Sequence, residues 1–334
     1  MNVVDSAKNA LLAVLEAEPG EKILIIADQE KEEVANAFSN AALEIGLWAR
    51  RIILEKPKEY RKEVPVYLKE IVLSSNVDIF MNLLRGVAEE VSFRIQLIKL
   101  ETRRKLRLAH CPGVTIDMLK DGALSLTIDE YRKMQDLAQR LLLALSDVEK
   151  VIVRNPHGTD VEFSVKGRTF FTDVKFDWKT MKWINIPVGE VIVAPVENGM
   201  NGVIVADLAA GGIGKLKSPI KFIVEEGSIR SIECEDREVK NRVTNLLLNT
   251  DSMSKTIGEF AIGLNKKARI TDEFLEAEKV DKTVHFAFGN NEDFPGGKNT
   301  SRIHIDFLLS KPDVTIIYED GREKDIMRNG QLLL

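Results

Sequence analysis

Two histidines and an aspartate in the last part of the chain have the types and spacing of a metal site. His304 and Asp306 are two positions apart in an apolar stretch that reads as a strand, so their side chains project from the same face. A histidine beside a carboxylate on such a strand indicates either a hydrogen-bonded pair or a metal ion. His285 lies in a second predicted strand, whose same face otherwise carries only alanine and glycine. These small residues leave space for an ion, and two imidazoles with one carboxylate suit iron or zinc.

Two glutamates could extend this set. Glu190 and Glu259 each follow a glycine and open an apolar strand, a position that fits either an exposed strand end or a metal ligand. With the two histidines and the aspartate they would supply five oxygen and nitrogen ligands. A hydrolytic site with two metal ions about 3.5–4 Å apart needs about that many, and uses the ions to activate water and to clamp the attacked carbonyl group.

The segments around these five residues resemble the M29 metallo-aminopeptidases, the family of aminopeptidase T and aminopeptidase S. The resemblance covers nearly the whole chain, and it is carried by residues 19–26, 185–191, 258–263, 285–289, 303–306, 312–315 and 321. It implies an α/β domain followed by a β-rich metal domain, and a homodimer. It also implies two divalent ions, which we expect to be zinc, cobalt or manganese.

By this resemblance, the metal ligands are Glu190, Glu259, His285, His304 and Asp306. The implied reaction is hydrolysis of an N-terminal peptide bond by water that the two ions activate, with a peptide or another small molecule as the substrate. Glu190 or Glu259 would also act as the general base, and the sequence leaves open which one does so.

The chain departs from the family pattern after the first histidine, His285. Family members carry a tyrosine a few residues later, placed to assist the reaction, whereas residues 289–296 contain none. Asn291 and Glu292 occupy this region, and we expect them to contact the substrate. The interval from His285 to His304 is also shorter than in the family's peptidases.

Two other functions stay open. His285, His304 and Asp306 alone would satisfy a mononuclear non-haem iron site, and some ring-cleaving iron dioxygenases are similar to this family in fold. Glu190 and Glu259 favour the hydrolase, because a mononuclear site would not need them. The third interpretation is a metal-binding homologue without turnover, which the missing tyrosine supports.

The first part of the chain must supply the scaffold, and it alternates between apolar runs and helical patterns. The patterns predict strands at residues 22–27, 48–54, 77–83 and 105–109 and helices at 30–45, 64–74, 88–102 and 129–146. Such alternation predicts a doubly wound, flavodoxin-like α/β domain over residues 1–150. No GxGxxG motif follows any of these strands, so we expect no dinucleotide site.

The metal residues fall in the second part of the chain, where β-rich runs lie between frequent turns. Strands are expected at residues 161–165, 190–194, 203–206 and 220–224, a closing hairpin at 314–322, and helices near 235–248 and 271–280. This pattern predicts a mostly antiparallel α+β domain over residues 151–334 that binds the metal and carries catalysis.

The composition excludes several classes of protein. Of 334 residues, 47 are Lys or Arg and 52 are Asp or Glu, so the net charge of −5 lacks the basic excess of a nucleic-acid binder. No apolar run approaches the roughly 18 residues that cross a membrane, so we expect no membrane partner. Two cysteines, Cys111 and Cys234, exclude a disulfide framework and an all-thiolate metal site, and we expect a cytoplasmic protein.

Overall fold

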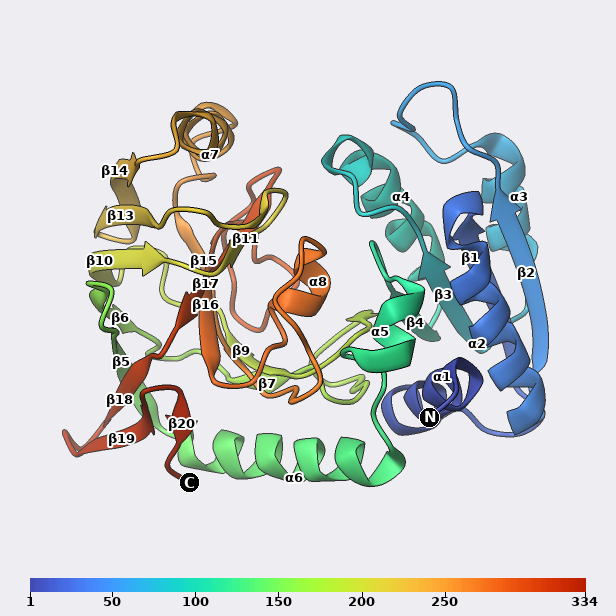
Figure 1. Ribbon diagram of the computed structural model, residues 1–334, viewed down its shortest axis with the longest axis horizontal. Coiled ribbons are helices and arrows are strands. Elements are labelled where there is room, and N and C mark those ends of the chain that lie inside the picture. The colour runs from blue at the N-terminus through green and yellow to red at the C-terminus, as the bar shows by residue number, and fades with distance from the viewer. The chain divides into compact units, whose positions relative to one another are not determined.

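The computed structural model describes residues 1–334 apart from the side chain of Ala88, and the chain divides into two compact units (Figure 1). The first unit contains residues 1–133 and 173–188, and the second contains residues 134–172 and 189–334. The sequence predicts one boundary, at residue 150. The structure instead has the chain leave the first unit and return to it, because residues 173–188 carry a short strand of the first sheet.

The first unit is built on a parallel sheet with the strand order β2-β1-β3-β4-β8. Its strands are β1 (Lys22–Asp28), β2 (Trp48–Leu54), β3 (Ile79–Leu83), β4 (Arg107–His110) and β8 (Ile184–Asn185). Its helices are α1 (Val3–Val14), α2 (Glu32–Ile45), α3 (Val66–Ser74), α4 (Val91–Glu101) and α5 (Ile116–Asp121), with short 3₁₀ turns at Gln29–Lys31 and Ala88–Glu90. The helix α6 (Ile128–Ala144) continues into the second unit.

The local sequence explains these elements. Strand β1 is buried at every position after Lys22, as expected of a parallel strand that is covered on both faces. Helix α2 ends at Gly46, whose φ of 95° lies in the left-handed region that favours glycine. The predicted α/β fold class with a doubly wound first part is therefore confirmed.

The second unit consists of two antiparallel sheets and helices α7 (Arg237–Asn249) and α8 (Phe274–Ala277). The eight-stranded sheet has the order β14-β13-β10-β6-β5-β18-β19-β20, formed by Ser228–Cys234, Ile220–Glu225, Met200–Ala206, Asp160–Ser164, Val148–Arg154, Asp313–Tyr318, Glu323–Arg328 and Gln331–Leu332. The seven-stranded sheet has the order β12-β11-β17-β16-β15-β9-β7, formed by Gly214–Lys215, Ala209–Ala210, His304–Ser310, Thr283–Gly289, Ile257–Gly263, Glu190–Val193 and Phe171–Thr172.

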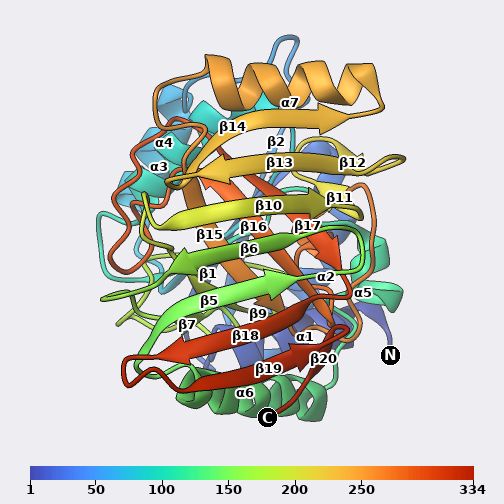
Figure 2. The same ribbon diagram turned by 90° about the vertical axis from the view of Figure 1, so that its left-hand side faces the viewer.

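Aromatic side chains join these two sheets face to face. Figure 2 views the eight-stranded sheet from its outer side, with the strands of the seven-stranded sheet behind it. Phe163 of β6 contacts Phe260 of β15, with 5.0 Å between the ring centroids, and also contacts Phe286 of β16. Phe222 of β13 likewise contacts Phe288 and Phe307. One face of the seven-stranded sheet is thus held in an aromatic core, which leaves its other face for a site.

The strand register places all five predicted metal ligands on that other face. Residues directly opposite each other in antiparallel strands point to the same side. Each predicted ligand has a small residue opposite it in a neighbouring strand. The opposite pairs are Glu190 with Gly263, Glu259 with Ala287, His285 with Ala261, His304 with Gly289 and Asp306 with Ala287. Alanine and glycine between the ligands leave the space that an ion requires.

Candidate metal centre

The five side chains converge as two groups that share one glutamate. Glu190, Glu259 and His285 offer ligand atoms that all lie within 4.8 Å of one another, and so do Glu259, His304 and Asp306. Strands β9, β15, β16 and β17 each contribute to this centre, and β17 supplies two residues because alternate positions share a face. The structure therefore brings together every residue that the sequence predicts as a ligand.

His304 is oriented by a backbone oxygen. Its Nδ1 atom lies 2.7 Å from the oxygen of Asn290, so Nδ1 carries the proton and donates it to that oxygen. Its Nε2 atom lies 2.9 Å from Oε2 of Glu259 and 3.2 Å from Oδ1 of Asp306. A histidine that ligates a metal through one nitrogen commonly donates the other N–H to a carbonyl group.

His285 lies deeper, with a side chain that is 1% exposed. Its Nε2 atom is 3.4 Å from Oε1 of Glu259, 3.6 Å from Oε2 of Glu190 and 3.8 Å from Oδ1 of Asp306. Two ligand atoms that are each about 2.1 Å from a tetrahedral ion lie roughly 3.4 Å apart. The separations around this nitrogen are therefore those of ligands around an ion, and longer than those of strong hydrogen bonds.

The electrostatics keep the shared glutamate ionised. Burial raises the pKa of Glu259, but hydrogen bonds from His285 and His304 outweigh burial and hold this pKa below its usual range. Burial lowers the pKa of His304, but the charge of Asp306 outweighs the effect of burial. The pKa of His304 is therefore raised well above its usual value. Three carboxylates and two imidazoles, drawn together in this way, are a donor set that fits divalent metal ions.

Two charged residues lie beside the centre, and the sequence does not predict them there. Lys279 is 1% exposed, forms an ion pair with Glu190, and lies 2.9 Å from Oε1 of Glu278. Burial raises the pKa of Glu278 to about 8, against the effect of the neighbouring Lys279. Both residues follow helix α8 in a stretch that the sequence predicts as a helix, where charged residues are ordinary. No pattern in the sequence indicates that they are buried.

The segment where family members carry a tyrosine lies against the centre. Asn291 is buried, and its amide donates to the oxygen of Gly258 and accepts from the nitrogen of Asn299, so it braces the backbone. Glu292 is exposed and lies 3.3 Å from Nδ2 of Asn290. The expected contact of Asn291 and Glu292 with substrate stays a prediction.

The contacts from this segment to the ligands come from other residues. Asn290 supplies the oxygen that orients His304, and the ring of Phe294 packs edge-on against that of His304, with 5.9 Å between the centroids. Phe294 also contacts Phe171, 5.3 Å between centroids. A main-chain oxygen gives no sequence signal, and an aromatic residue in a turn-rich segment gives little.

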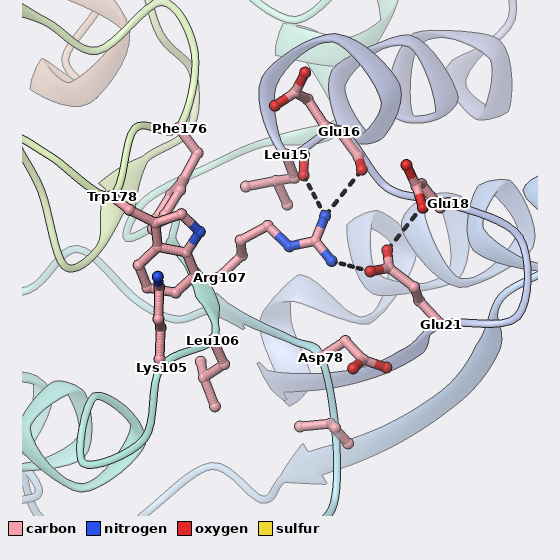
Figure 3. Close-up of a pocket in the computed structure, with 11 residues that line it drawn as sticks. Leu15, Glu16, Glu18, Glu21, Asp78, Lys105, Leu106, Arg107, Phe176 and Trp178 are labelled. Atoms are coloured by element: carbon pink, nitrogen blue, oxygen red, sulfur yellow. Dashed lines mark hydrogen bonds and ion pairs between the residues drawn. The ribbon is translucent and has the colours of Figure 1, made fainter.

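A separate cavity of about 510 Å³ lies in the first unit (Figure 3). Arg107 extends into it and donates to the oxygens of Leu15 and Glu16, and it forms an ion pair with Glu21. Lys105 lies over the ring of Trp178. Because these cations are engaged by neighbouring groups, the cavity gives no indication of a reaction.

Comparisons with known proteins agree with the geometry of the candidate metal centre. The sequence model of a family described as thermophilic metalloprotease (M29) matches residues 127–332. Aminopeptidase AmpS from Bacillus subtilis (strain 168) is 27% identical over an alignment of 165 positions, and the alignment covers 44% of this chain. The matched stretch covers 40% of that relative's length. In the described part of the chain, no helix is long and apolar enough to cross a membrane.

Solved structures show the same fold over the full chain. Wild-type AmpT from Thermus thermophilus matches with a TM-score of 0.77 at 18% identity, covering 100% of this chain and 99% of that one. The 2,5-dihydroxypyridine dioxygenase from Pseudomonas putida KT2440 matches with a TM-score of 0.71 at 16% identity, covering 99% and 96%. At these identities the likeness establishes the fold alone.

Proposed function

The chain belongs to the M29 family of metalloproteases, and from this premise we propose that it is a metal-dependent aminopeptidase. The observation that carries the proposal is the convergence of two donor groups on the shared, buried Glu259. The relative from Bacillus subtilis is an aminopeptidase by name, which supports the release of N-terminal residues as the reaction. We further propose a cytoplasmic homodimer, as expected from the sequence.

We propose that two divalent ions, of zinc, cobalt or manganese, are held at the centre. One donor group is Glu259, His304 and Asp306, and the other is Glu190, Glu259 and His285. When bound, the ions would supply Lewis acidity, which lowers the pKa of water and polarises a carbonyl group. A shared carboxylate that stays ionised is well suited to link two such positions.

The chain's own residues would perform the remaining steps. Glu259 or Glu190 would accept a proton from the attacking water at a carboxylate oxygen and pass it to the departing amine. The carboxylates would also accept hydrogen bonds from the free α-ammonium group of the substrate, so we expect a preference for unblocked N-termini. His304 would stay fixed in orientation through its Nδ1–H bond to Asn290.

The experiment compares a short peptide that has a free N-terminus with its N-acetylated form. We expect the protein supplied with cobalt, zinc or manganese to release the first residue from the free peptide only, and we expect a chelator to stop the release. Equal cleavage of the acetylated peptide, or cleavage that a chelator leaves unchanged, would overturn the proposal.

A ring-cleaving dioxygenase is the second candidate, because a dioxygenase shares this fold over nearly the whole chain. His285, His304 and Asp306 would then hold one iron ion. Glu190→Ala separates the two functions. It should abolish peptide hydrolysis, whereas oxygen consumption with a dihydroxylated aromatic ring should continue nearly unchanged if the centre is mononuclear.

A further inference from the structure

The two donor groups differ in the charge that lies beside them. Lys279 is buried and pairs with Glu190, which belongs to only one group. Glu278 lies 2.9 Å from the same ammonium nitrogen and holds it from a second side. In the other group, the ion pairs described for Asp306 are with His285 and His304, and no lysine or arginine takes part in them.

The two groups also differ in how firmly their histidines are oriented. The Nδ1 atom of His304 is hydrogen-bonded to the oxygen of Asn290. The Nδ1 atom of His285 is buried and has no hydrogen-bond partner among the described residues. A partner on the far nitrogen fixes the tautomer and ring orientation of a metal-binding histidine. The group that contains His304 is therefore the better prepared of the two.

We propose that the centre binds its ions in two unequal steps, and that Lys279 is the positioning residue that weakens the second. This inference rests on the proposed metal site. The first ion binds Glu259, His304 and Asp306. The second must bind Glu190, Glu259 and His285 next to a buried ammonium group, which repels a divalent ion and competes with it for the carboxylate of Glu190.

The repulsion is large because the groups are shielded from water. Like charges a few ångströms apart interact far more strongly in a protein interior than in bulk water. The burial of Lys279 and of Glu190 therefore makes the ammonium an effective competitor. The protein therefore holds one ion firmly and binds the second ion only when the concentration of free metal is high.

The test titrates the full-length, metal-free protein with Co²⁺, followed by calorimetry and by the visible absorption of the bound ion. We expect two steps whose dissociation constants differ at least tenfold in the wild type. His304→Ala should remove the tight step, and His285→Ala should remove the weak step alone.

Lys279→Met should tighten the second step at least tenfold and leave the first within about twofold. Lys279→Arg, which keeps the charge, should retain the gap, and Lys266→Met removes an exposed lysine of the same unit as a control. If Lys279→Met does not fold, the wild-type steps and the two histidine variants still test whether the two ions bind unequally.

Two equal steps in the wild type, or an unchanged second step in folded Lys279→Met, would overturn the inference and leave the metal site intact. A wild type that binds no Co²⁺, or whose binding survives both histidine variants, would instead contradict the proposed function.

Discussion

The Nδ1 atom of His304 and the backbone oxygen of Asn290 lie 2.7 Å apart. This contact turns the opposite nitrogen of the ring toward Glu259 and Asp306. It joins a turn-rich segment, where the family's tyrosine is missing, to a strand that carries two of the five ligands. The segment that departs from the expected family pattern therefore orients one of the candidate ligands.

Removal of His304 should abolish function without unfolding the protein. The ring is 30% exposed at the open side of the centre, so His304→Ala takes away a ligand and little core packing. We expect a fall of at least 100-fold in metal-dependent peptide hydrolysis, measured by amino-acid release. His157→Ala is the matched control, since this histidine lies in an exposed turn. Equal losses in both variants would refute the assignment.

The segment that orients His304 should affect metal affinity. The side chain of Asn290 donates to the oxygen of Ser301 and accepts from the nitrogen of Glu292, so Asn290→Ala loosens the carbonyl group that holds His304. Loss of such an outer contact typically costs 10–100-fold in metal affinity, and we expect about tenfold in a competition titration. Glu292→Gln keeps the backbone nitrogen and should bind metal normally. It also tests the expected substrate contact, since a raised KM would support it.

Stability without metal should fall as the pH rises. Burial lowers the pKa values of His285 and His304, but the carboxylates around them outweigh burial and raise both above 6.5. A group whose pKa is raised by folding stabilises the folded state fully below its unfolded value, and this stability is lost as the pH rises through the folded value.

The unfolding midpoint of chelated protein should therefore decrease from about pH 6.5 upward, as followed by thermal melts. The melting temperature of the metal-loaded protein should exceed that of the chelated protein by an amount that grows over the same pH range, because the metal requires unprotonated imidazole. The chelated His304→Ala variant should show a shallower decrease. A slope identical to that of the wild type would show that His304 does not carry this linkage.

A buried glutamate in the first unit should give a second pH effect, independent of metal. Burial raises the pKa of Glu101 to about 8, against a hydrogen bond that Asn82 donates to it at 2.7 Å. Folding therefore binds a proton, and the free energy of unfolding should fall as the pH rises between about 4.5 and 8. Glu101→Gln should remove this slope and stabilise the protein at pH 8 in chemical denaturation. Glu33→Gln, on the exposed side of α2, is the control, and matching curves for both would disprove the shift.

Part of the candidate site can be predicted from the sequence, because alternation along a strand determines the face to which each side chain points. His304 and Asp306 share a face in any strand, and the alanine and glycine positions near His285 mark a face with open space. The grouping of Glu190 and Glu259 with them rests on the number of ligands that a two-metal site needs and on the resemblance to a family, because a glutamate after glycine has several ordinary explanations.

The sequence does not predict residues whose role depends on tertiary contacts. Lys279 meets Glu190 across 89 positions of sequence, and Asn290 acts through a main-chain oxygen that every residue possesses. Strand β8 has only two residues, too few for any periodicity, so the return of the chain to the first unit could not be foreseen. The α/β character of the first part of the chain and the β-rich character of the second part are predictable, because longer elements repeat their hydrophobic pattern several times.

Metal content per chain distinguishes a two-ion centre from a mononuclear one. It should be measured by plasma mass spectrometry on protein purified without chelator and then equilibrated with zinc, cobalt or manganese. We expect two divalent ions per chain in the wild type and at most one in His285→Ala. A single iron ion per chain, unchanged in Glu190→Ala, would contradict the two-ion centre, and no bound metal under any condition would contradict the metal site itself.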